Sequence, residues 1–182
     1  MPVLNQKIAL ITGASRGIGQ AIAQAYLREG AKLALVATRQ QPLQQMCEQW
    51  GVSPEQALCI GADVSDADQA QQAVTQTLKR WGRIDVLVNN AGNTPRGTLF
   101  EVDEATWRQG WELKIFGYIN LTRAVYRQMF QRRRIARRAG EPRTKPIAEL
   151  LEELMRHTRR LGRRQGKRQT RGEQAASAKL TE

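Results

Sequence analysis

Three glycines near the start of the chain limit the folds that are open to it. The segment Thr12-Gly13-Ala14-Ser15-Arg16-Gly17-Ile18-Gly19 follows an apolar run, 8–11, and precedes a stretch with helical spacing of apolar residues. A strand, a glycine turn and a helix in this order can bind a phosphate, because backbone N–H groups at the helix start face the anion. We expect Gly13 to turn the chain sharply, Gly17 to leave backbone N–H groups accessible, and Gly19 to bring the helix close to the strand. The alternative is that these glycines serve only a tight turn.

Downstream of this unit, apolar runs alternate with amphipathic stretches. Strands are predicted at 7–11, 32–37, 57–60 and 84–88, and helices at 16–29, 41–50, 66–81 and 104–132. This rhythm predicts a Rossmann-type α/β fold, a doubly wound parallel sheet between two layers of helices. No apolar run for a fifth strand follows the last of these helices, so residues 86–88 are predicted to form an exposed sheet edge. We expect marginal stability, self-association, or cover of this edge by the C-terminal tail.

Four motifs, in chain order, resemble those of the short-chain dehydrogenase/reductase family. The glycine segment matches the TGxxxGxG fingerprint, Asp63-Val64 matches the adenine-side motif, and Asn89-Asn90-Ala91-Gly92 matches the NNAG block. The second predicted strand also ends about 20 residues after Gly19, where the family contacts the adenosine ribose. The resemblance covers residues 3–130. It implies an NAD(P)-dependent oxidoreductase that transfers a hydride to or from a small carbonyl or alcohol substrate.

The resemblance also implies which residues bind the cofactor. They are Gly13, Ser15, Arg16, Gly17, Ile18, Gly19, Thr38, Arg39, Asp63, Val64, Asn90, Ala91 and Gly92. Asn89 is expected to be structural and to tie neighbouring strands. The second strand is followed by Thr38 and Arg39 instead of an acid, and Arg16 adds another guanidinium, so we expect NADP in preference to NAD. The alternative is that Arg39 is a solvated surface residue.

The catalytic half of the family pattern is missing from this sequence. In the family, a tyrosine donates a proton and a lysine one helical turn later lowers its pKa. Four positions after the three tyrosines of this chain stand Gly30, Thr122 and Phe130, so there is no Tyr-x-x-x-Lys pair. Lys114 takes the place of the supporting Asn, where it could hold a proton or a substrate carboxylate. The alternative is a lysine that extends from the helix surface into solvent.

The composition changes abruptly near residue 131. Residues 1–130 carry 13 Lys and Arg against 11 Asp and Glu, a net charge of +2, whereas residues 131–182 carry 16 against 6, a net charge of +10. All ten aromatic residues lie before position 131. We therefore predict a dinucleotide-binding domain at 1–130 and a basic tail at 131–182, with an amphipathic helix at 146–161.

Three interpretations of the tail remain open. It is a solvated extension without specific function, a nonspecific binder of nucleic acid or another anionic surface, or the product of a lost reading frame near Gln131. No aromatic residue interleaves its arginines to stack bases, so nucleic acid is not expected as a specific partner. For the chain as a whole, the alternative to an oxidoreductase is a non-catalytic dinucleotide-binding or interaction protein with a basic tail.

The remaining features concern compartment and assembly. Cys47 and Cys59 form no metal or redox motif and are interpreted as ordinary thiols of a reducing compartment. No apolar run approaches the length of a membrane span, and the first residues lead directly into a strand instead of a signal peptide. We expect a cytoplasmic protein without a metal ion or membrane contact, and we leave a homo-oligomer open.

Overall fold

The computed structural model describes residues 2–93, 95–98 and 100–138. The elements are β1 (Ile8–Thr12), α1 (Gly17–Arg28), β2 (Lys32–Ala37), α2 (Gln41–Gln49), β3 (Ala57–Gly61), α3 (Ala67–Trp81), β4 (Val86–Val88), α4 (Glu104–Trp111), the π-helical turn η1 (Glu112–Phe116) and α5 (Gly117–Arg138). The chain divides into two compact units, Met1–Ile135 and Ala136–Glu182, and the four strands belong to the first. The predicted helix at 146–161 lies outside the described residues.

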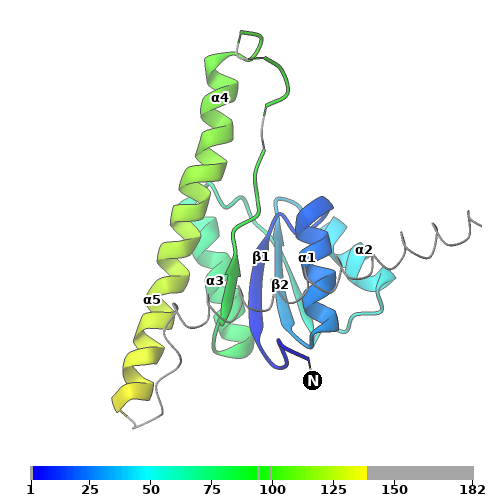
Figure 1. The fold of residues 1–182 in the computed structure, drawn as a ribbon, viewed down its shortest axis with the longest axis vertical. Coiled ribbons are helices and arrows are strands. Elements are labelled where there is room, and N and C mark those ends of the chain that lie inside the picture. Colours follow the sequence, from blue (N-terminus) through cyan, green and yellow to red (C-terminus); the bar gives the residue numbers. More distant parts are fainter. Residues whose placement is uncertain (1, 94, 99, 139–182) are drawn as a thin grey trace, which may run out of the picture. The chain divides into compact units, whose positions relative to one another are not determined.

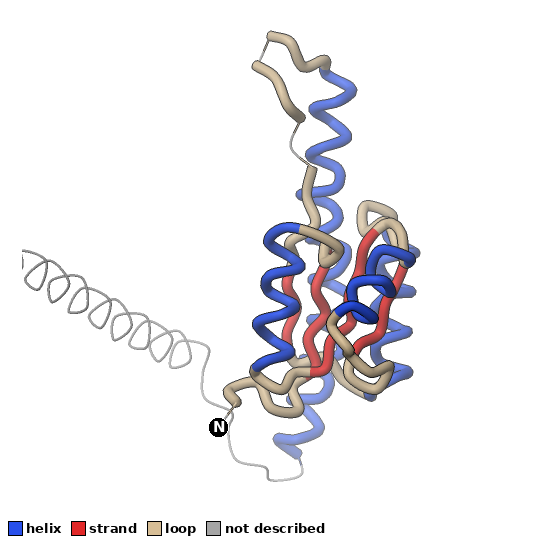
Figure 2. Tube along the Cα trace, turned by 90° about the vertical axis from the view of Figure 1, so that its right-hand side faces the viewer, coloured by secondary structure: helices blue, strands red, loops and turns tan. Residues whose placement is uncertain are grey.

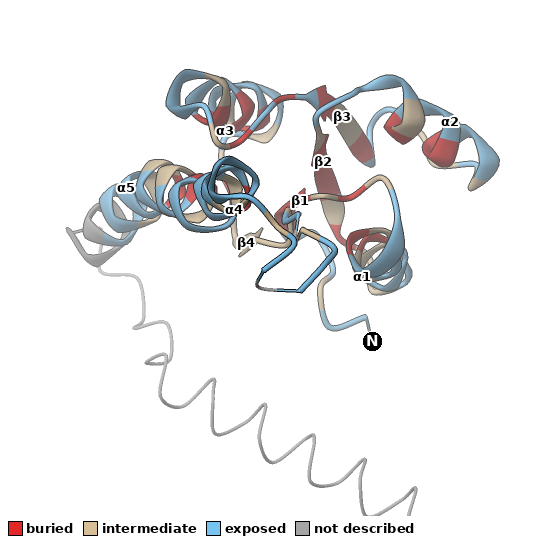
Figure 3. Cartoon of the chain, turned by 90° about the horizontal axis from the view of Figure 1, so that it is seen from above, coloured by how far each residue is buried: buried red, intermediate tan, exposed pale blue. Residues whose placement is uncertain are grey.

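The described strands form one parallel sheet in the order β3-β2-β1-β4 (Figure 1). In the register of its two central strands, Ile8 lies opposite Lys32 and Thr12 opposite Val36. The strands lie between helices, as Figure 2 shows. Seen along the strands in Figure 3, α1 and α2 cover one face of the sheet, while α3 and α5 cover the other. The predicted Rossmann-type fold is therefore confirmed.

Alternate residues of β1 belong to two separate cores, because successive side chains of a strand point to opposite faces. Leu10 packs in the cluster that contains Val74 of α3 and Leu121 of α5. Ala9 and Ile11 pack in the cluster that holds the buried side chains of α1 and α2. All five residues of β1 are buried, as expected for a strand covered on both faces.

Local hydrogen bonding marks the start of α3, and a left-handed glycine marks its end. The Asp66 carboxylate accepts hydrogen bonds from the backbone N–H groups of Asp68 (2.8 Å) and Gln69 (3.0 Å). These bonds lower the pKa of Asp66, that from Gln69 most. The helix ends at Gly82, whose φ of 75° is left-handed and suits a residue without Cβ.

The last predicted helix differs from the observed one in two ways. Instead of one helix over 104–132, the chain forms α4, the π-helical turn η1, and α5, which continues to Arg138. Two glycines near the turn approach other segments closely: a Cβ on Gly110 of α4 would lie 3.0 Å from the Asn93 carbonyl oxygen, and one on Gly117, the first residue of α5, would lie 3.2 Å from Val64 Cγ2. The spacing of apolar residues along the segment carries no information about these contacts with distant residues. For this reason the pattern predicts a continuous helix. The domain boundary predicted at 130 falls inside α5 and stays a prediction.

The sheet edge at β4 agrees with the prediction from the sequence. In the described part of the chain, β4 pairs only with β1, and all three of its residues are half-buried. The strand is also shorter than the predicted 84–88. No helix among the described residues combines the length and the apolar character that crossing a membrane requires.

Candidate dinucleotide-binding site

The glycine turn lies between the end of β1 and the start of α1. Gly13 and Gly17 have φ angles of 61° and 57°, a left-handed conformation that glycine adopts without a Cβ penalty. A Cβ on Gly19 would overlap the Gly13 carbonyl oxygen, so only glycine allows the helix to approach the turn this closely. A Cβ on Gly17 would meet no protein atom within 4 Å. The turn is thus packed tightly against the protein at Gly19, whereas at Gly17 its backbone faces open space.

The N-terminus of α1 offers backbone donors for an anion. Its capping residue, Arg16, has an extended backbone and no side-chain cap, and no acid stands in the first turn. The first N–H groups of a helix have no partner inside it and lie at the positive end of its dipole. Arg16 and Ile18 are exposed beside these donors, and Ser15 is partly buried. The backbone here fits the diphosphate of a dinucleotide.

Thr12 fastens the glycine turn to the segment after β4. Its buried hydroxyl accepts hydrogen bonds from the backbone N–H groups of Asn90 (3.0 Å) and Ala91 (2.9 Å) and donates to the Val88 carbonyl (3.3 Å). The Asn90 side-chain amide donates to the carbonyls of Thr12 (3.0 Å) and Gly13 (3.2 Å). The Asn90 side-chain amide is therefore used in hydrogen bonds within the protein, and only the backbone of Asn90 is left to contact a ligand. In the sequence, Thr12 is the first residue of the TGxxxGxG match and the polar end of an apolar strand, but these signals did not predict its hydrogen bonds.

Asn89 binds a helix where we expected it to tie strands. Its amide nitrogen donates to the Thr122 hydroxyl of α5 at 3.0 Å. Its Oδ1 atom is buried and has no hydrogen-bond partner among the described residues. The prediction for Asn89 is wrong in its partner, because in the described sheet β4 is an edge strand and has no neighbour on that side.

The remaining predicted cofactor residues follow the carboxyl ends of β2, β3 and β4. Because the strands are parallel, these ends lie on the same side of the sheet as the glycine turn. Thr38 and Arg39, after β2, are exposed. The Asp63 carboxylate, after β3, uses Oδ1 to accept hydrogen bonds from the Ser65 N–H (3.0 Å) and hydroxyl (2.7 Å). Val64 is 3% exposed and part of the core, so only its backbone could contact a ligand. Gly92 is exposed after β4.

Lys114 lines a cavity beside the segment that follows β4. This cavity has a volume of about 390 Å³ and lies between α4, η1 and the segment after β4; its walls are Asn93, Pro95, Trp107, Gly110, Trp111, Lys114 and Ile115. Lys114 itself is exposed, and among the described residues that line the cavity none comes from the glycine turn. The Trp107 indole nitrogen is buried and has no partner in the described part of the chain. We did not predict this cavity from the sequence, in which the four-residue spacing of Trp107, Trp111 and Ile115 was the only signal for it.

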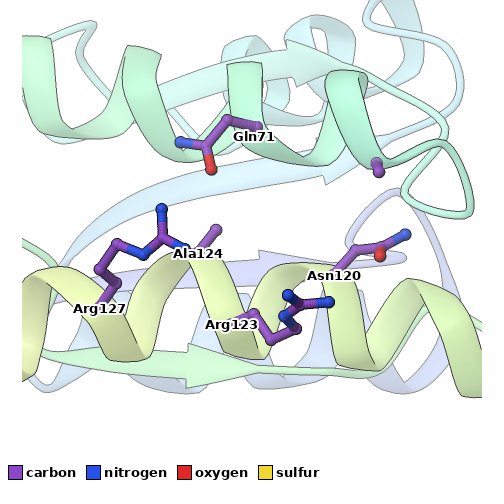
Figure 4. Close-up of a pocket in the computed structure, with 6 residues that line it drawn as sticks. Gln71, Asn120, Arg123, Ala124 and Arg127 are labelled. Atoms are coloured by element: carbon purple, nitrogen blue, oxygen red, sulfur yellow. The ribbon is translucent and has the colours of Figure 1, made fainter.

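A second, smaller cavity of about 180 Å³ separates α3 from α5 (Figure 4). Gln71 of α3 faces Arg123 and Arg127 of α5 across it. At one end, the Asn120 amide donates to the Ser65 carbonyl at 3.1 Å. Both arginines are exposed, so this cavity is an open groove with a basic wall.

A parallel sheet in this order, with a glycine turn from β1 into an uncapped helix, is the Rossmann-type arrangement found in proteins that bind dinucleotides. The family follows from the sequence matched along that sheet. The chain belongs to the short chain dehydrogenase family, whose model matches residues 7–137. The family resemblance expected from the four motifs is therefore confirmed.

Individual relatives support the same assignment. The chain is 40% identical over 119 residues to 11-beta-hydroxysteroid dehydrogenase A of Sesamum indicum, a match that covers 64% of this chain and 34% of that protein. It is 35% identical over 126 residues to sorbitol dehydrogenase of Cereibacter sphaeroides, covering 69% of this chain and 48% of that protein. The crystal structure of a short-chain dehydrogenase from Streptomyces avermitilis aligns with a TM-score of 0.63 and 39% identity, over 70% of this chain and 46% of that one. The chain thus spans between a third and a half of these proteins' lengths.

Proposed function

We propose that this chain binds NADP(H) as the cofactor-binding part of a short-chain oxidoreductase. The observation that carries the proposal is the glycine turn: its backbone is open at Gly17, and the N-terminus of α1 has neither a side-chain cap nor an acid. These are the features that a diphosphate requires. Asp63 would accept a hydrogen bond from the adenine amine, and the backbone of Asn90, Ala91 and Gly92 would lie beside the nicotinamide ribose.

Two exposed guanidinium groups support NADP over NAD. Arg16 and Arg39 stand in the loops that follow β1 and β2, and no acid follows β2. Neither arginine forms an ion pair within residues 2–133, apart from 94 and 99, so both are available to a 2′-phosphate. Charge-assisted contacts from arginine to phosphate are bidentate and strong. NAD is the alternative cofactor.

A bound nicotinamide would supply the hydride that is exchanged with a small carbonyl or alcohol substrate. The given sequence contains no Tyr-x-x-x-Lys pair that could supply the proton. Lys114 is our candidate for holding a proton or a substrate carboxylate, beside the apolar walls of its cavity. We further propose that the protein acts in the cytoplasm.

The absence of the Tyr-x-x-x-Lys pair favours a second candidate function. In it, the chain is a non-catalytic dinucleotide-binding or interaction protein, and its basic tail binds nucleic acid nonspecifically. Turnover of any carbonyl substrate by the purified chain would exclude this candidate. A nucleic-acid mobility shift that disappears on deletion of residues 131–182 would support it.

Calorimetric titrations of the purified chain with NADPH and with NADH test the proposal. We expect saturable binding that favours NADPH. Arg39→Ala should weaken NADPH binding by about tenfold and leave NADH binding unchanged, because only the phosphate contact is lost. Arg28→Ala, at the far end of α1, is the matched control and should change neither affinity. Equal binding of both cofactors would contradict the NADP preference, and binding of neither would contradict the proposed function.

A further inference from the structure

Two cysteines that are twelve residues apart lie in direct contact. Cys47 is on α2 and Cys59 is on β3, and their Sγ atoms are 3.6 Å apart. Cys47 is 8% exposed, and Cys59 is partly exposed. Both pack in the cluster that α1 and α2 form with one face of the sheet. They are the only cysteines in the sequence, so the pair has no competing thiol within the chain.

The surroundings of the pair do not form a metal site. Among the described residues, no group of three or more His, Cys, Asp and Glu side chains is placed to hold a metal ion. The two sulfurs instead share a hydrogen bond in which either can donate. This bond lowers the pKa of Cys47, while it raises the pKa of Cys59, which burial raises further. The pair thus favours the loss of one proton over the loss of two, and a single thiolate is the form that reacts with oxidants.

We propose that Cys47 and Cys59 are an oxidation site, at which a peroxide converts the two thiols into a disulfide between α2 and β3. In the first step, one thiol is oxidised to a sulfenic acid: the O–O bond of hydrogen peroxide breaks, an S–O bond forms, and water leaves. In the second step, the other sulfur attacks the sulfenic sulfur, the S–O bond breaks, and a second water carries away the hydroxyl and the thiol proton. Two thiols and one peroxide thus give one disulfide and two waters.

The position of the pair in the fold permits the closure. A disulfide bond is about 2.05 Å long, so the sulfurs must approach each other by about 1.5 Å. Cys47 stands near the end of α2, a nine-residue helix, and β3 pairs only with β2 in the described sheet. A short helix over an edge strand can shift by this amount with less disruption than an element between two neighbours. The bond would close the surface segment 48–58 into a loop.

The test uses the full chain, reduced and then exposed to hydrogen peroxide. The protein is next denatured, its remaining thiols are alkylated, and its peptides are mapped by mass spectrometry without a reductant. We expect both thiols to disappear and a linked Cys47–Cys59 peptide to appear, lighter by two hydrogen atoms than the separate peptides. Dithiothreitol should restore both thiols.

Single variants identify the intermediate. In Cys47→Ser and Cys59→Ser the remaining thiol has no partner, so each variant should accumulate a sulfenic acid that dimedone traps, and the linked peptide should be absent. Because the wild-type chain alone supplies the linked peptide, a variant that fails to fold leaves the test intact. Persistence of both thiols, oxidation to sulfinic or sulfonic acids only, or disulfides solely between two chains would overturn the proposal.

Discussion

The two sides of the described sheet differ in how completely they are covered. On the β1 and β2 side, all residues of β1 are buried, and α1 and α2 close one face with a continuous apolar cluster. On the β4 side, the strand has three half-buried residues and no further neighbour in the described part. The predicted cofactor site therefore follows a strand that is buried on both faces. In contrast, β4 and α5 leave surface that only a further segment could cover.

Large apolar side chains gather on the less covered side. The exposed ones on α4, η1 and α5 are Trp111, Ile115, Phe116, Ile119, Tyr126 and Phe130. Tyr126 and Phe130 stack on each other, with ring centroids 6.0 Å apart. Exposed apolar surface of this kind favours association, so we expect substitutions on the two sides to have different kinds of effect.

The largest effect is expected from a substitution in the glycine turn. Gly19→Ala places a Cβ on the Gly13 carbonyl oxygen, so we expect a loss of about 3 kcal/mol in the free energy of unfolding, together with loss of NADPH binding. Urea denaturation and calorimetric titration measure the two quantities. Gly51→Ala is the control, because it has a positive φ of 65° but open space around it, and should cost about 1 kcal/mol without affecting binding. Equal losses in the free energy of unfolding for the two variants would contradict the tight packing inferred at Gly19.

The second effect concerns the fastening of β1 to the segment after β4. Thr12→Val keeps the shape of the side chain and leaves the N–H groups of Asn90 and Ala91 without their acceptor, so we expect a loss of about 2 kcal/mol. NADPH affinity should fall as well, since the backbone of both segments would shift. The change is measured by urea denaturation. As a control, Thr75→Val on the exposed side of α3 should change stability by less than about 0.5 kcal/mol.

A smaller effect, dependent on pH, comes from Asp85. Burial disfavours its charged form, but hydrogen bonds from the Ile8 N–H (3.0 Å) and from Arg83 (2.9 Å) and Arg132 (3.0 Å) outweigh burial and lower the pKa of Asp85. A carboxyl whose pKa is lower in the folded state stabilises the protein above its unfolded pKa of about 3.9 and loses this effect as the pH falls through the folded value.

The corresponding variant is Asp85→Asn. At about pH 7 it should destabilise the chain by about 1 kcal/mol, and the difference from the wild type should shrink steadily as the pH falls below about 4. Thermal unfolding, followed from about pH 7 down to about pH 2, measures this difference. Arg132→Ala, which removes one exposed partner, should cost less than about 0.5 kcal/mol. A difference that grows on acidification would contradict the assignment.

The smallest change in stability is expected on the exposed face of α5. We expect the wild-type chain to self-associate and the double variant Tyr126→Glu, Phe130→Lys to do so less, while the free energy of unfolding at low concentration changes by less than about 0.5 kcal/mol. Sedimentation velocity over a range of concentrations measures the association. Val3→Lys, at an even more exposed apolar position outside α5, should leave association unchanged. A monomeric wild-type chain that unfolds cooperatively at high temperature would remove the basis of the comparison.

Much of the fold could be predicted because its signals are local. The apolar run of β2 was predicted at its observed bounds, Lys32–Ala37, and the helix predicted at 66–81 differs from α3 (Ala67–Trp81) by one residue. The π-helical turn could not be predicted, because its flanking glycines are fixed by contacts with Asn93 and Val64, which are distant in the sequence. The predicted cofactor residues follow the carboxyl ends of the strands, and Lys114 lines a cavity whose described walls include none of them.

The sequence by itself determined the family, the strand–helix alternation and the glycine turn, since each depends on the order and spacing of neighbouring residues. Only the tertiary structure decided that Thr12 fastens two strand ends, that Asn89 binds α5, and that Cys47 contacts Cys59. These relations join residues from different elements. They depend on how strands and helices pack against one another, and the spacing of residues along one segment carries no record of that packing.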